Sequence, residues 1–596
     1  MTSIVQTLSP VTNSQAAASV AALVARYLAE QGVQRVYGLC GGHIQPLWDE
    51  VSRAGIQIVD VRHEGSAVYM AHAEAELTGR VGVALVTAGP GLTNALTAVA
   101  NAEKSRIPVL VISGVPPLQQ EGRLAMQDVP QRRMIEPVSR LTLSVTLPDQ
   151  TLARLDSVMR AAQGHDGPPG PAYIEFPTDV LRSDAVRTHV DEDWLQPVHV
   201  PARTPDPRTI ADAVALIRRA RRPLVIAGRA VHSCTDVLPK FLEASGALYL
   251  DTVESRGALP EGHEASVPSL RGQAMREADL IITLDRLLDF QLAYGSPAVY
   301  GPDASFLRVG RTSGEVAFNR RGDVQMQADV ASALDALTKH DLEVTSRDST
   351  WRAAMTTSNQ EKRRRAAEAL RTAPAGNEDG RMHPNRLIAE LNSVIDDSTL
   401  VVADGGDILS FARVGLRHGA RYLDCGPLGC LGVGVPFATA GALVSTDRRV
   451  VCLVGDGSFG FTAMDLETAV RFGARILVVV ANNDGWNIER MDQIDTYGGN
   501  LVGVELGPCR YDQLAQSLGA YGERVEDPAS LAPAIERALA HDGPALLDVA
   551  VTREAFSPDY LSGLAVLPDH QPLARWNTAE LRYRSSWSDP DHQVSV

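Results

Sequence analysis

Several features that mark secreted, membrane-spanning or zinc-binding proteins are missing from this chain of 596 residues. Its six cysteines are scattered and no two of them form a C-x-x-C pair, so neither disulfides nor a zinc site are expected. No apolar run reaches the roughly 18 residues that a membrane-spanning helix needs. The first residues, MTSIVQTLSPVTNSQ, have neither the charged nor the apolar region of a signal peptide. We therefore expect a cytoplasmic protein.

A basic surface is also missing. The net charge is −16, and lysine and arginine are spread through the chain rather than gathered in patches. A negative protein repels the phosphates of nucleic acids and of anionic membranes, so neither is an expected partner. The short basic run at 362–365 is better explained as a solvated helix face or a linker than as a binding patch.

The sequence does contain an alternation of short β-branched runs and longer helical stretches, which is typical of parallel α/β sheets. Proline-rich or polar stretches near 195–209 and 340–384 divide these runs into three sets. The pattern predicts an α/β protein with three doubly wound parallel sheets, in domains at 1–190, 205–340 and 385–560, and a C-terminal tail at 561–596. The expected strands are 36–41, 56–61, 81–89, 108–114 and 172–177, then 223–228, 247–252, 280–284 and 306–310, then 400–406, 449–458, 476–484 and 545–551.

Two polar motifs follow neighbouring strands of the third set. Gly455-Asp456-Gly457-Ser458 leaves the end of one strand, and Asn482-Asn483 leaves the end of the next, with Asn483 27 residues after Asp456. Ligands gather beyond the carboxyl ends of parallel strands, and carboxylate and amide oxygens hold Mg²⁺ together with phosphate and water. The glycines let a diphosphate approach the backbone, and the helix after Ser458 points its N-terminus at it. Either motif alone could be a turn after a strand; the spacing of the two predicts a Mg²⁺–diphosphate site.

The pair of motifs resembles the signature of thiamine diphosphate (ThDP) enzymes, in which GDG is followed one crossover later by NN. By that resemblance, Asp456, the side chain of Asn483 and the backbone carbonyl of Gly485 hold the metal. Such an enzyme also needs a carboxylic acid that shares a proton with the aminopyrimidine ring of ThDP. The resemblance assigns this role to Glu64, which ends the run VRHE and begins the next expected helix. Taken alone, Glu64 could instead be a helix N-terminal carboxylate stabilised by the helix dipole.

The resemblance extends over roughly residues 15–555 to the ThDP-dependent decarboxylase and carboligase superfamily, which has a pyrimidine, a central and a diphosphate domain. It is strongest with the acetolactate synthase-like branch and includes a likeness to benzaldehyde lyase. The stretches that carry it are GLCGGHIQPLWDE (38–50), RHEGSAVYMAHAEAELTGRVGVALVTAGPGLTNALTAVANA (62–102), AMQDVPQ (125–131) and GPLGCLGVGVPFA (426–438).

Within these stretches the resemblance implies roles for four residues. His43 and Gln127 would move protons at the reacting carbon, and Gly89 belongs to a glycine turn that lets ring and substrate lie against bare backbone. Leu431 would be the apolar residue that bends ThDP into its V shape. The alternatives are that His43 caps a loop in the core, that Gln127 is a surface turn residue and that Leu431 is ordinary core. The G-x-x-G-x-G at 429–434 could also be a dinucleotide loop, but it lacks an acidic residue about 20 positions further on.

Three departures from the family pattern narrow the expected activity. No His-His pair follows SGVPP (113–117), whereas pyruvate decarboxylase has one. WNIERMDQIDTYGG (486–499) lacks the Gln-Trp pair of the synthases that select ketoacids, which counts against acetolactate formation itself. LDRLLDF (284–290) replaces the Gly-Ala-Arg of relatives that hold FAD or CoA there, which counts against FAD.

The expected function is that of a ThDP- and Mg²⁺-dependent carboligase or lyase that acts on 2-ketoacids or 2-hydroxyketones through an enamine intermediate. A 2-ketoacid decarboxylase and a 2-hydroxyacyl-CoA lyase are the alternative enzymes. A non-catalytic regulatory homologue is a third alternative, although Glu64, Asp456 and Asn483 are all present. The resemblance also implies a homodimer or homotetramer with ThDP at the subunit interface, because one ThDP must touch both Glu64 and Asp456.

Overall fold

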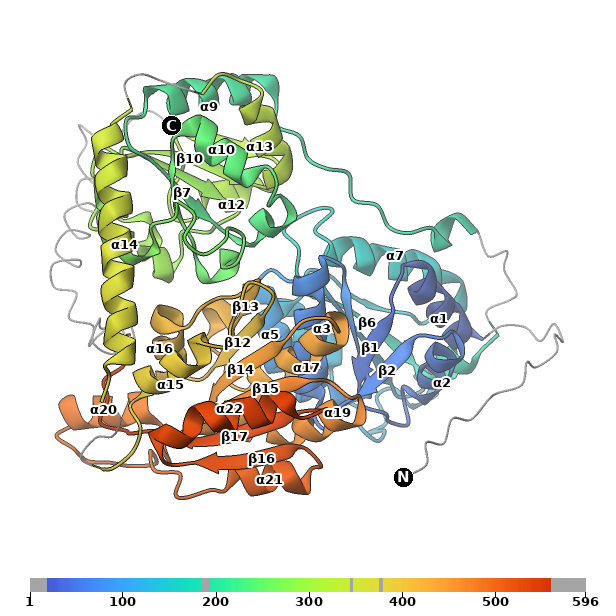
Figure 1. Cartoon of the computed structure of the whole chain (residues 1–596). Helices are drawn as coiled ribbons and strands as arrows, with labels where there is room; N and C mark the ends of the chain where they lie inside the picture. The colour runs from blue at the N-terminus through green and yellow to red at the C-terminus, as the bar shows by residue number, and fades with distance from the viewer. Residues whose placement is uncertain (1–18, 185–191, 343–346, 375–378, 559–596) are drawn as a thin grey trace.

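The computed structural model describes residues 19–184, 192–342, 347–374 and 379–558, and these form three parallel sheets with flanking helices (Figure 1). This confirms the expected class, an α/β protein built from doubly wound parallel sheets. We refer to each sheet with its helices as the first, the central and the third domain. The expected tail, 561–596, lies outside the described residues. Among the described residues, no helix is long and apolar enough to cross a membrane.

The first domain contains all the strands that its apolar runs predict. Its sheet has the order β2-β1-β3-β4-β6-β5, in which the short edge strand β5 is the one that the sequence does not predict. The strands are β1 Arg35–Gly38, β2 Gln57–Asp60, β3 Gly82–Val86, β4 Val109–Val115, β5 Thr142–Ser144 and β6 Ala172–Pro177. The main helices are α1 Val20–Glu30, α2 Gln45–Arg53, α3 Glu64–Thr78, α4 Pro90–Thr93, α5 Leu96–Lys104, α6 Gln131–Ile135, α7 Thr151–Ala162 and α8 Thr178–Arg182.

The central domain has a five-stranded sheet in the order β11-β10-β9-β7-β8, so the strand order reverses between β7 and β9. The strands are β7 Pro223–Ala227, β8 Leu248–Leu250, β9 Leu280–Leu284, β10 Ser305–Gly310 and β11 Val324–Gln327. The helices are α9 Pro207–Arg219, α10 Leu238–Ser245, α11 Arg271–Glu277, α12 Ser313–Ala317 and α13 Val330–Thr338.

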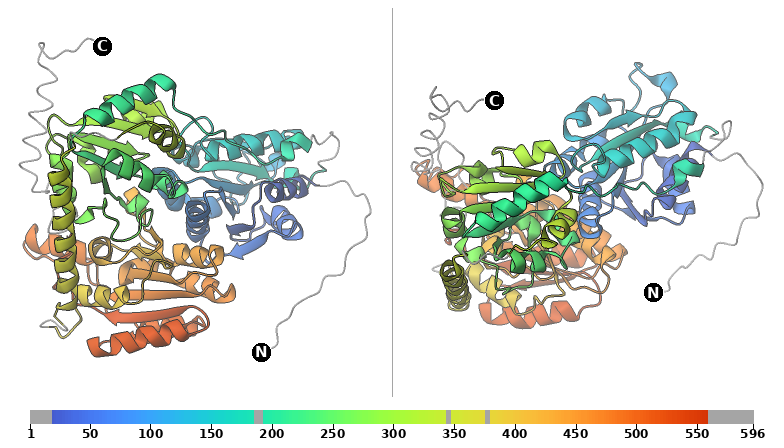
Figure 2. Two further views of the ribbon diagram at one scale, coloured as in Figure 1. Left: turned by 45° about the horizontal axis from the view of Figure 1, so that its top comes forward. Right: turned by 90° about the horizontal axis from the view of Figure 1, so that it is seen from above.

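The polar stretch near 340–384 contains a long helix, α14 Ser349–Arg371, which runs along the outside of the molecule from the central to the third domain (Figure 2). Its buried residues are Trp351, Met355 and Asn359, all in its first half. The basic run at 362–365 lies in the second half, where most side chains are exposed. The interpretation of that run as a solvated helix face is therefore confirmed.

The third domain has a six-stranded sheet in the order β13-β12-β14-β15-β17-β16. Its inner strands are buried on both faces, which explains their nearly continuous apolar sequences. The strands are β12 Leu400–Asp404, β13 Arg421–Leu423, β14 Val450–Gly455, β15 Ile476–Asn482, β16 Tyr521–Val525 and β17 Ala545–Ala550. The helices are α15 Pro384–Asn392, α16 Asp407–Gly415, α17 Gly434–Val444, α18 Asp456–Thr462, α19 Leu466–Arg471, α20 Asn487–Asp495, α21 Tyr511–Ser517 and α22 Leu531–Ala540.

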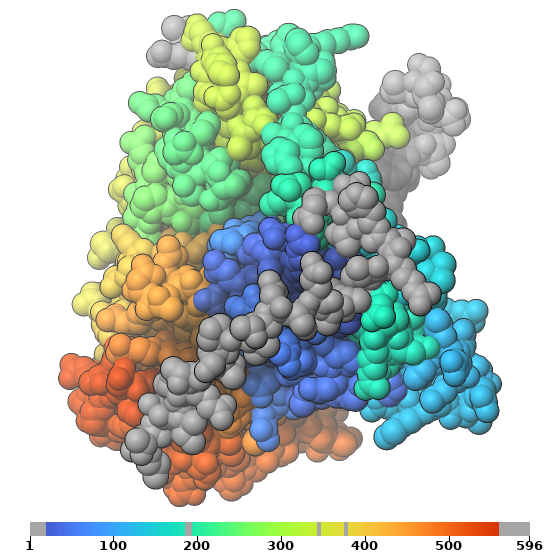
Figure 3. All heavy atoms as spheres, turned by 90° about the vertical axis from the view of Figure 1, so that its right-hand side faces the viewer, coloured from blue at the N-terminus to red at the C-terminus, as the bar shows by residue number. Residues whose placement is uncertain are grey.

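The first and third domains share one hydrophobic core, and their atoms lie directly against each other in Figure 3. Helices α3 and α17 pack together at this junction, where the rings of Tyr69 and Phe437 meet edge to face at 6.2 Å. Both helices are apolar or small around most of their circumference, and such helices are buried on all sides. Since Glu64 is the first residue of α3, this packing holds it at the junction of the two domains.

Candidate active site

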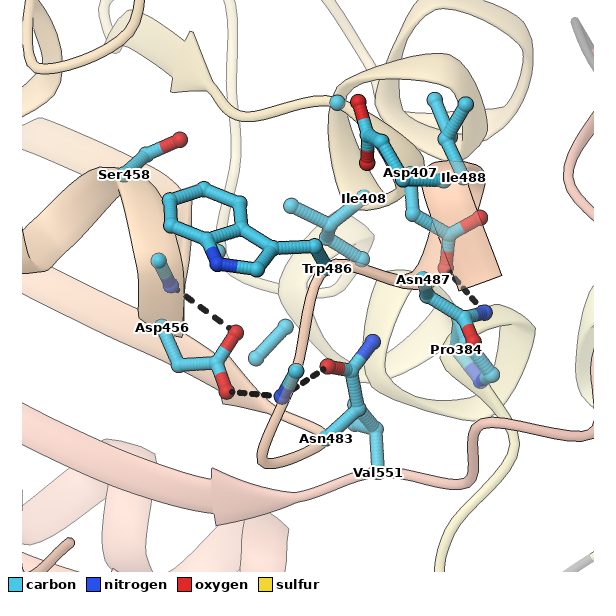
Figure 4. A pocket seen from close by; sticks show the side chains of 16 residues that line it. Pro384, Asp407, Ile408, Asp456, Ser458, Asn483, Trp486, Asn487, Ile488 and Val551 are labelled. Carbon is cyan, nitrogen blue, oxygen red and sulfur yellow. Dashed lines mark hydrogen bonds between the residues drawn. The ribbon is translucent and has the colours of Figure 1, made fainter. Parts of the chain in front are cut away.

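The two motifs of the third domain meet because β14 and β15 are neighbours in the sheet. The carboxyl of Asp456 accepts hydrogen bonds from the backbone N–H of Gly457 (2.9 Å) and of Gly485 (3.1 Å). The Gly485 N–H also donates to the side-chain oxygen of Asn483 at 3.1 Å (Figure 4). The structure thus brings together the residues that the sequence predicts as metal ligands.

The surroundings of Asp456 suit a divalent cation. Asp456 and Asn483 are 3% and 6% exposed, and burial raises the pKa of the Asp456 carboxyl to about 6. No cationic side chain of the described residues forms an ion pair with it. The Asp456 carboxylate and the Asn483 amide oxygen both accept from the Gly485 N–H, so these two hard donors lie close together, and a metal ion would offset the unfavourable burial of the charge. These residues therefore fit Mg²⁺.

A cavity lies against this pair of oxygens. The first residues of α15, α16, α18 and α20 all line it, so four helix N-termini face it and favour an anionic ligand. The indole of Trp486 lies over α18 in Figure 4, and a side chain at Gly457 would come within 2.4 Å of that ring. The lining residues are Pro384, Gly406, Asp407, Ile408, Gly455, Asp456, Gly457, Ser458, Ala481, Asn483, Gly485, Trp486, Asn487, Ile488, Glu489 and Val551.

Asp407 is a site residue that the sequence motifs do not identify; it is the first residue of α16 and lines the same cavity. Its carboxyl accepts a hydrogen bond of 3.1 Å from the amide of Asn487, and burial raises its pKa to about 6. Asp407 could have been predicted from the sequence, because it directly follows the expected strand 400–406. The rule that ligands gather at strand ends would have identified it.

Glu64 opens α3 and is 6% exposed. The first turn of its helix is capped by the imidazole of His63, which accepts from the Gly65 N–H at 3.0 Å. Glu64 therefore does not serve as the side-chain cap of α3. Its carboxyl instead accepts a hydrogen bond of 3.0 Å from the amide of Asn94, whose role the sequence motifs do not indicate.

His43, Gly89 and Gln127 form one cluster at the carboxyl edge of the first sheet. Nδ1 of His43 and Oε1 of Gln127 are 3.0 Å apart. Gly89 has a φ of 60° and abuts Gln127 so closely that an added Cβ would lie 2.7 Å from the carbonyl oxygen of Gln127. Gln127 itself has a φ of 64°, an uncommon conformation for a residue with a side chain and one that occurs at functional sites. Asn94 follows the turn that begins at Gly89, and it links this cluster to Glu64.

Leu431 lies in the loop that precedes α17. The backbone N–H groups of Gly432 and Gly434 donate to one carboxyl oxygen of Asp404 at 3.0 and 2.9 Å, and Thr462 donates to the Gly432 carbonyl at 3.0 Å. These bonds fix the loop on both sides. Leu431 is only partly buried, so its side chain is not enclosed in the core of this chain.

The predicted site has one half around Glu64 in the first domain and the other around Asp456 in the third, and the cavity at Asp456 does not extend to the first domain of the same chain. The cavity at Asp456 is lined by residues between 384 and 551, and none of them comes from the described part of the first domain, residues 19–184. Large apolar side chains are exposed beside both halves. Leu124 and Met126 are 98% and 80% exposed beside Gln127, and Phe461 of α18 is 62% exposed.

The segment LDRLLDF takes part in ion pairs at the point where the strand order of the central sheet reverses. Arg106 of the first domain reaches this point and pairs with Asp285 at 2.9 Å and Glu315 at 2.8 Å. Arg286 pairs with Glu254 and Asp289. A cavity of about 720 Å³ opens beside them between the three domains, and five arginines and two carboxylates are among its lining residues. The expectation that FAD is not bound stays a prediction.

Comparison with known proteins agrees with this arrangement. Three family models match the chain: thiamine pyrophosphate enzyme, N-terminal TPP binding domain, at 18–134; its central domain at 210–337; and its C-terminal TPP binding domain at 405–549. Thiamine pyrophosphate is another name for ThDP.

The relatives include a probable acetolactate synthase of Mycobacterium bovis, 31% identical over 542 residues that cover 88% of this chain and 94% of the relative. They also include 2-hydroxyacyl-CoA lyase 2 of Caenorhabditis elegans and of Homo sapiens, each 31% identical, over 85% and 84% of this chain and 84% of each relative. The chain is thus a ThDP-dependent enzyme that forms or cleaves carbon–carbon bonds, and it belongs to the thiamine pyrophosphate enzyme family with acetolactate synthase-like relatives.

Proposed function

We propose that this enzyme is a Mg²⁺-dependent carboligase or lyase that acts on 2-ketoacids or 2-hydroxyketones. The observation that supports this choice is the pairing of His43 with Gln127, in a position where decarboxylases of the superfamily use other groups. ThDP, when bound, supplies a nucleophilic carbon that adds to a carbonyl group and accepts the electrons of the bond that breaks beside it. The residues of the chain bind and orient the reactants and move protons.

In this proposal the metal is held by the carboxyl of Asp456, the side-chain oxygen of Asn483 and the backbone carbonyl of Gly485. Gly455, Gly457 and Ser458 receive the diphosphate, and the helix N-termini around the cavity stabilise its charge. The support is the burial of Asp456 and Asn483 and their shared hydrogen bond to Gly485.

Glu64 holds the proton that is exchanged with the aminopyrimidine ring. The Asn94 amide donates to its carboxyl and orients it. Gly89 has no side chain, so Gln127 can lie against its backbone, and Leu431, which is not enclosed in the core, would contact the bound cofactor.

His43 moves protons at the substrate oxygen. Because the Gln127 oxygen can only accept, the His43 Nδ1 carries the proton in this hydrogen bond and Nε2 is the basic nitrogen. A basic nitrogen held in this way can take a proton from an acceptor alcohol or return one to a forming alkoxide.

We also propose a homodimer or homotetramer in which Glu64 of one subunit and Asp456 of another serve the same ThDP. This is supported by the cavity at Asp456, whose lining residues lie within 384–551, and by the exposed apolar side chains of Leu124, Met126 and Phe461. A second subunit would remove these side chains from water and would bring the first domain to the cavity.

A cytoplasmic location is a further part of the proposal. All six cysteines are free thiols, and a reducing compartment keeps thiols unpaired. Cell fractionation with an antibody to the chain would test it, and recovery from the secreted fraction would contradict it.

Cleavage of a 2-hydroxyacyl-CoA is the second candidate activity. It is favoured by the relatives named 2-hydroxyacyl-CoA lyase 2 and by the large cavity between the three domains, because arginines such as Arg229 and Arg421 could bind the phosphates of CoA. Five arginines and two carboxylates line this cavity, and Arg106, Arg229, Arg311 and Arg421 already pair with carboxylates, so an anionic ligand would share these arginines with them.

Product analysis by mass spectrometry tests the proposal. Pyruvate and benzaldehyde should give an acyloin, whereas acetaldehyde as the sole product would contradict carboligation. Rapid cleavage of a 2-hydroxyacyl-CoA, with no acyloin from any ketoacid and aldehyde pair, would favour the second candidate.

A further inference from the structure

The segment around Glu64 is held by a carboxylate from the other domain. Asp465 of the third domain accepts a hydrogen bond from the Arg62 backbone N–H at 2.8 Å and one from the Ser66 hydroxyl at 2.5 Å. Glu64 lies midway between these two donors, two residues from each. One carboxyl group therefore bonds to the backbone two residues before the proposed catalytic acid and to the side chain two residues after it.

Asp465 is 1% exposed and Ser66 is fully buried. A third donor, the Thr468 hydroxyl, bonds to Asp465 at 3.2 Å. Burial raises the pKa of Asp465, and its hydrogen bonds oppose that effect. Burying a carboxyl group is unfavourable unless hydrogen bonds satisfy its oxygens. Loss of one donor is therefore expected to disturb the remaining hydrogen bonds of Asp465 as well.

A second contact from the third domain holds the end of β2, the strand that precedes α3. Arg471 of α19 donates to the side chain of Asp60 at 2.6 Å and to its backbone carbonyl at 2.7 Å. This pair is more exposed than the contacts of Asp465, and exposed pairs are screened by water. The buried carboxyl of Asp465 is therefore the stronger anchor of the two.

The side chain of Glu64 bonds to Asn94, whereas Asp465 contacts the residues on either side of Glu64. Any effect of Asp465 on proton transfer must thus pass through the backbone of the first turn of α3. We propose that Asp465 is a positioning residue, which fixes the start of α3 so that the Glu64 carboxyl meets the aminopyrimidine ring. This inference rests on the proposed role of Glu64.

The expected size of the effect follows from the geometry of proton transfer. A proton donor and acceptor must approach to about 2.6–3.2 Å, and a misplacement of about 1 Å can lower a rate about 10²-fold. Asp465→Asn keeps the volume and one acceptor oxygen, but it turns an NH₂ group toward one of the present donors. We expect exchange of the C2 proton of bound ThDP to fall about 10- to 100-fold, and ThDP affinity to change less than about 3-fold.

The experiment measures C2 proton exchange by NMR and ThDP affinity by calorimetry in the wild type, Asp465→Asn and a control, Asp512→Asn. Asp512 is also a buried carboxyl of the third domain, 3% exposed, but the side chain that donates to it, Arg510, belongs to the same domain. Slow exchange with retained affinity in Asp465→Asn alone supports the inference. Wild-type exchange in Asp465→Asn, or the same loss in the control, overturns it.

A second measurement does not require cofactor. Amide hydrogen exchange of the ThDP-free protein, followed by mass spectrometry, should show faster exchange in the peptide that spans Arg62–Ser66 in Asp465→Asn, and in Ser66→Ala to a lesser extent. Unchanged protection in both variants overturns the inference. Ser66→Ala removes one hydroxyl and also provides the test if Asp465→Asn does not fold.

Glu64→Gln separates this inference from the function on which it rests. If Glu64→Gln exchanges the C2 proton at the wild-type rate, the proposed role of Glu64 is wrong and the inference falls with it. If Glu64→Gln is slow while Asp465→Asn is unaffected, the role of Glu64 stands and the positioning role of Asp465 is wrong.

Discussion

Nδ1 of His43 and Oε1 of Gln127 lie 3.0 Å apart, although the two residues are separated by 84 positions in the chain. In the proposed arrangement the Gln127 oxygen accepts, so Nδ1 of His43 carries the proton and Nε2 is left as the basic nitrogen.

We expect His43→Ala to lower the turnover of carboligation by about 10²–10⁴, the usual effect of removing a proton-transfer group. Gln127→Ala should have a smaller effect, because it removes only the group that orients the ring. The double variant should be no slower than His43→Ala, since the two residues act as one unit. Steady-state kinetics that follow an acyloin product would measure these effects. Gln119→Ala, at an exposed position before the loop that contains Gln127, is the control. Fully additive losses would contradict a coupled pair.

Glu64→Gln should keep the fold, because the change is nearly isosteric, and should lower turnover by about 10²–10⁴. The amide of Asn94 would then face an amide rather than a carboxylate, which weakens the hydrogen bond seen here. The C2 proton exchange of bound ThDP measures the step directly. Glu30→Gln, at the exposed end of α1, should behave as the wild type.

Asp456→Ala removes the anionic ligand of the proposed metal site. We expect the affinity for ThDP and its dependence on Mg²⁺ to weaken together, because metal and diphosphate are bound as one unit. Calorimetric titration of ThDP with and without Mg²⁺ tests this. Wild-type enzyme treated with EDTA should resemble the variant, and undiminished ThDP affinity after EDTA treatment would refute the metal assignment.

Mixing two inactive variants tests whether sites are shared between subunits. Glu64→Ala and Asp456→Ala, combined after reversible dissociation, should recover up to about a quarter of the activity of an equal amount of wild type. Random mixing makes half of the dimers mixed, and in each mixed dimer one site carries both lesions and the other carries neither. If subunit exchange is demonstrated and no activity returns, each site is built within one chain.

Asp404 should make the stability of the cofactor-free protein depend on pH. It is fully buried, burial raises its pKa to about 6, and one of its oxygens has no hydrogen-bond partner among the described residues. Because the folded-state pKa is raised, the favourable contribution is complete below about pH 4 and is lost as the pH rises through about 6. The loss is up to about 3 kcal/mol.

Asp404→Asn stays neutral at every pH. The difference in thermal midpoint, variant minus wild type, should therefore be more positive at pH 7.5 than at pH 5.0. Scanning calorimetry of the cofactor-free proteins would show it. An equal difference at both pH values would mean that Asp404 does not titrate in this range in the folded protein.

The inner strands were predictable because a strand buried on both faces is apolar at nearly every position, as in β14 and β15. The edge strands β5, β11, β13 and β16 were not, because they are short or carry mixed side chains such as those of β16, Tyr521–Val525. The helix α14 was obscured for a related reason. It is polar around most of its surface, and in sequence such a helix resembles a linker.

The sequence by itself determined the cofactor class, because a GDG and an NN that each leave a strand end must meet wherever the two strands are neighbours in a parallel sheet. It also determined that Glu64 starts a helix. Only the tertiary structure decided which groups surround that acid. Asn94 of the same domain donates a hydrogen bond to it, and Asp465, about 400 positions away, accepts from the Arg62 N–H and the Ser66 hydroxyl on either side of it. The physical reason is that local propensity and period act over a few residues, whereas these contacts depend on how two domains pack across a shared core.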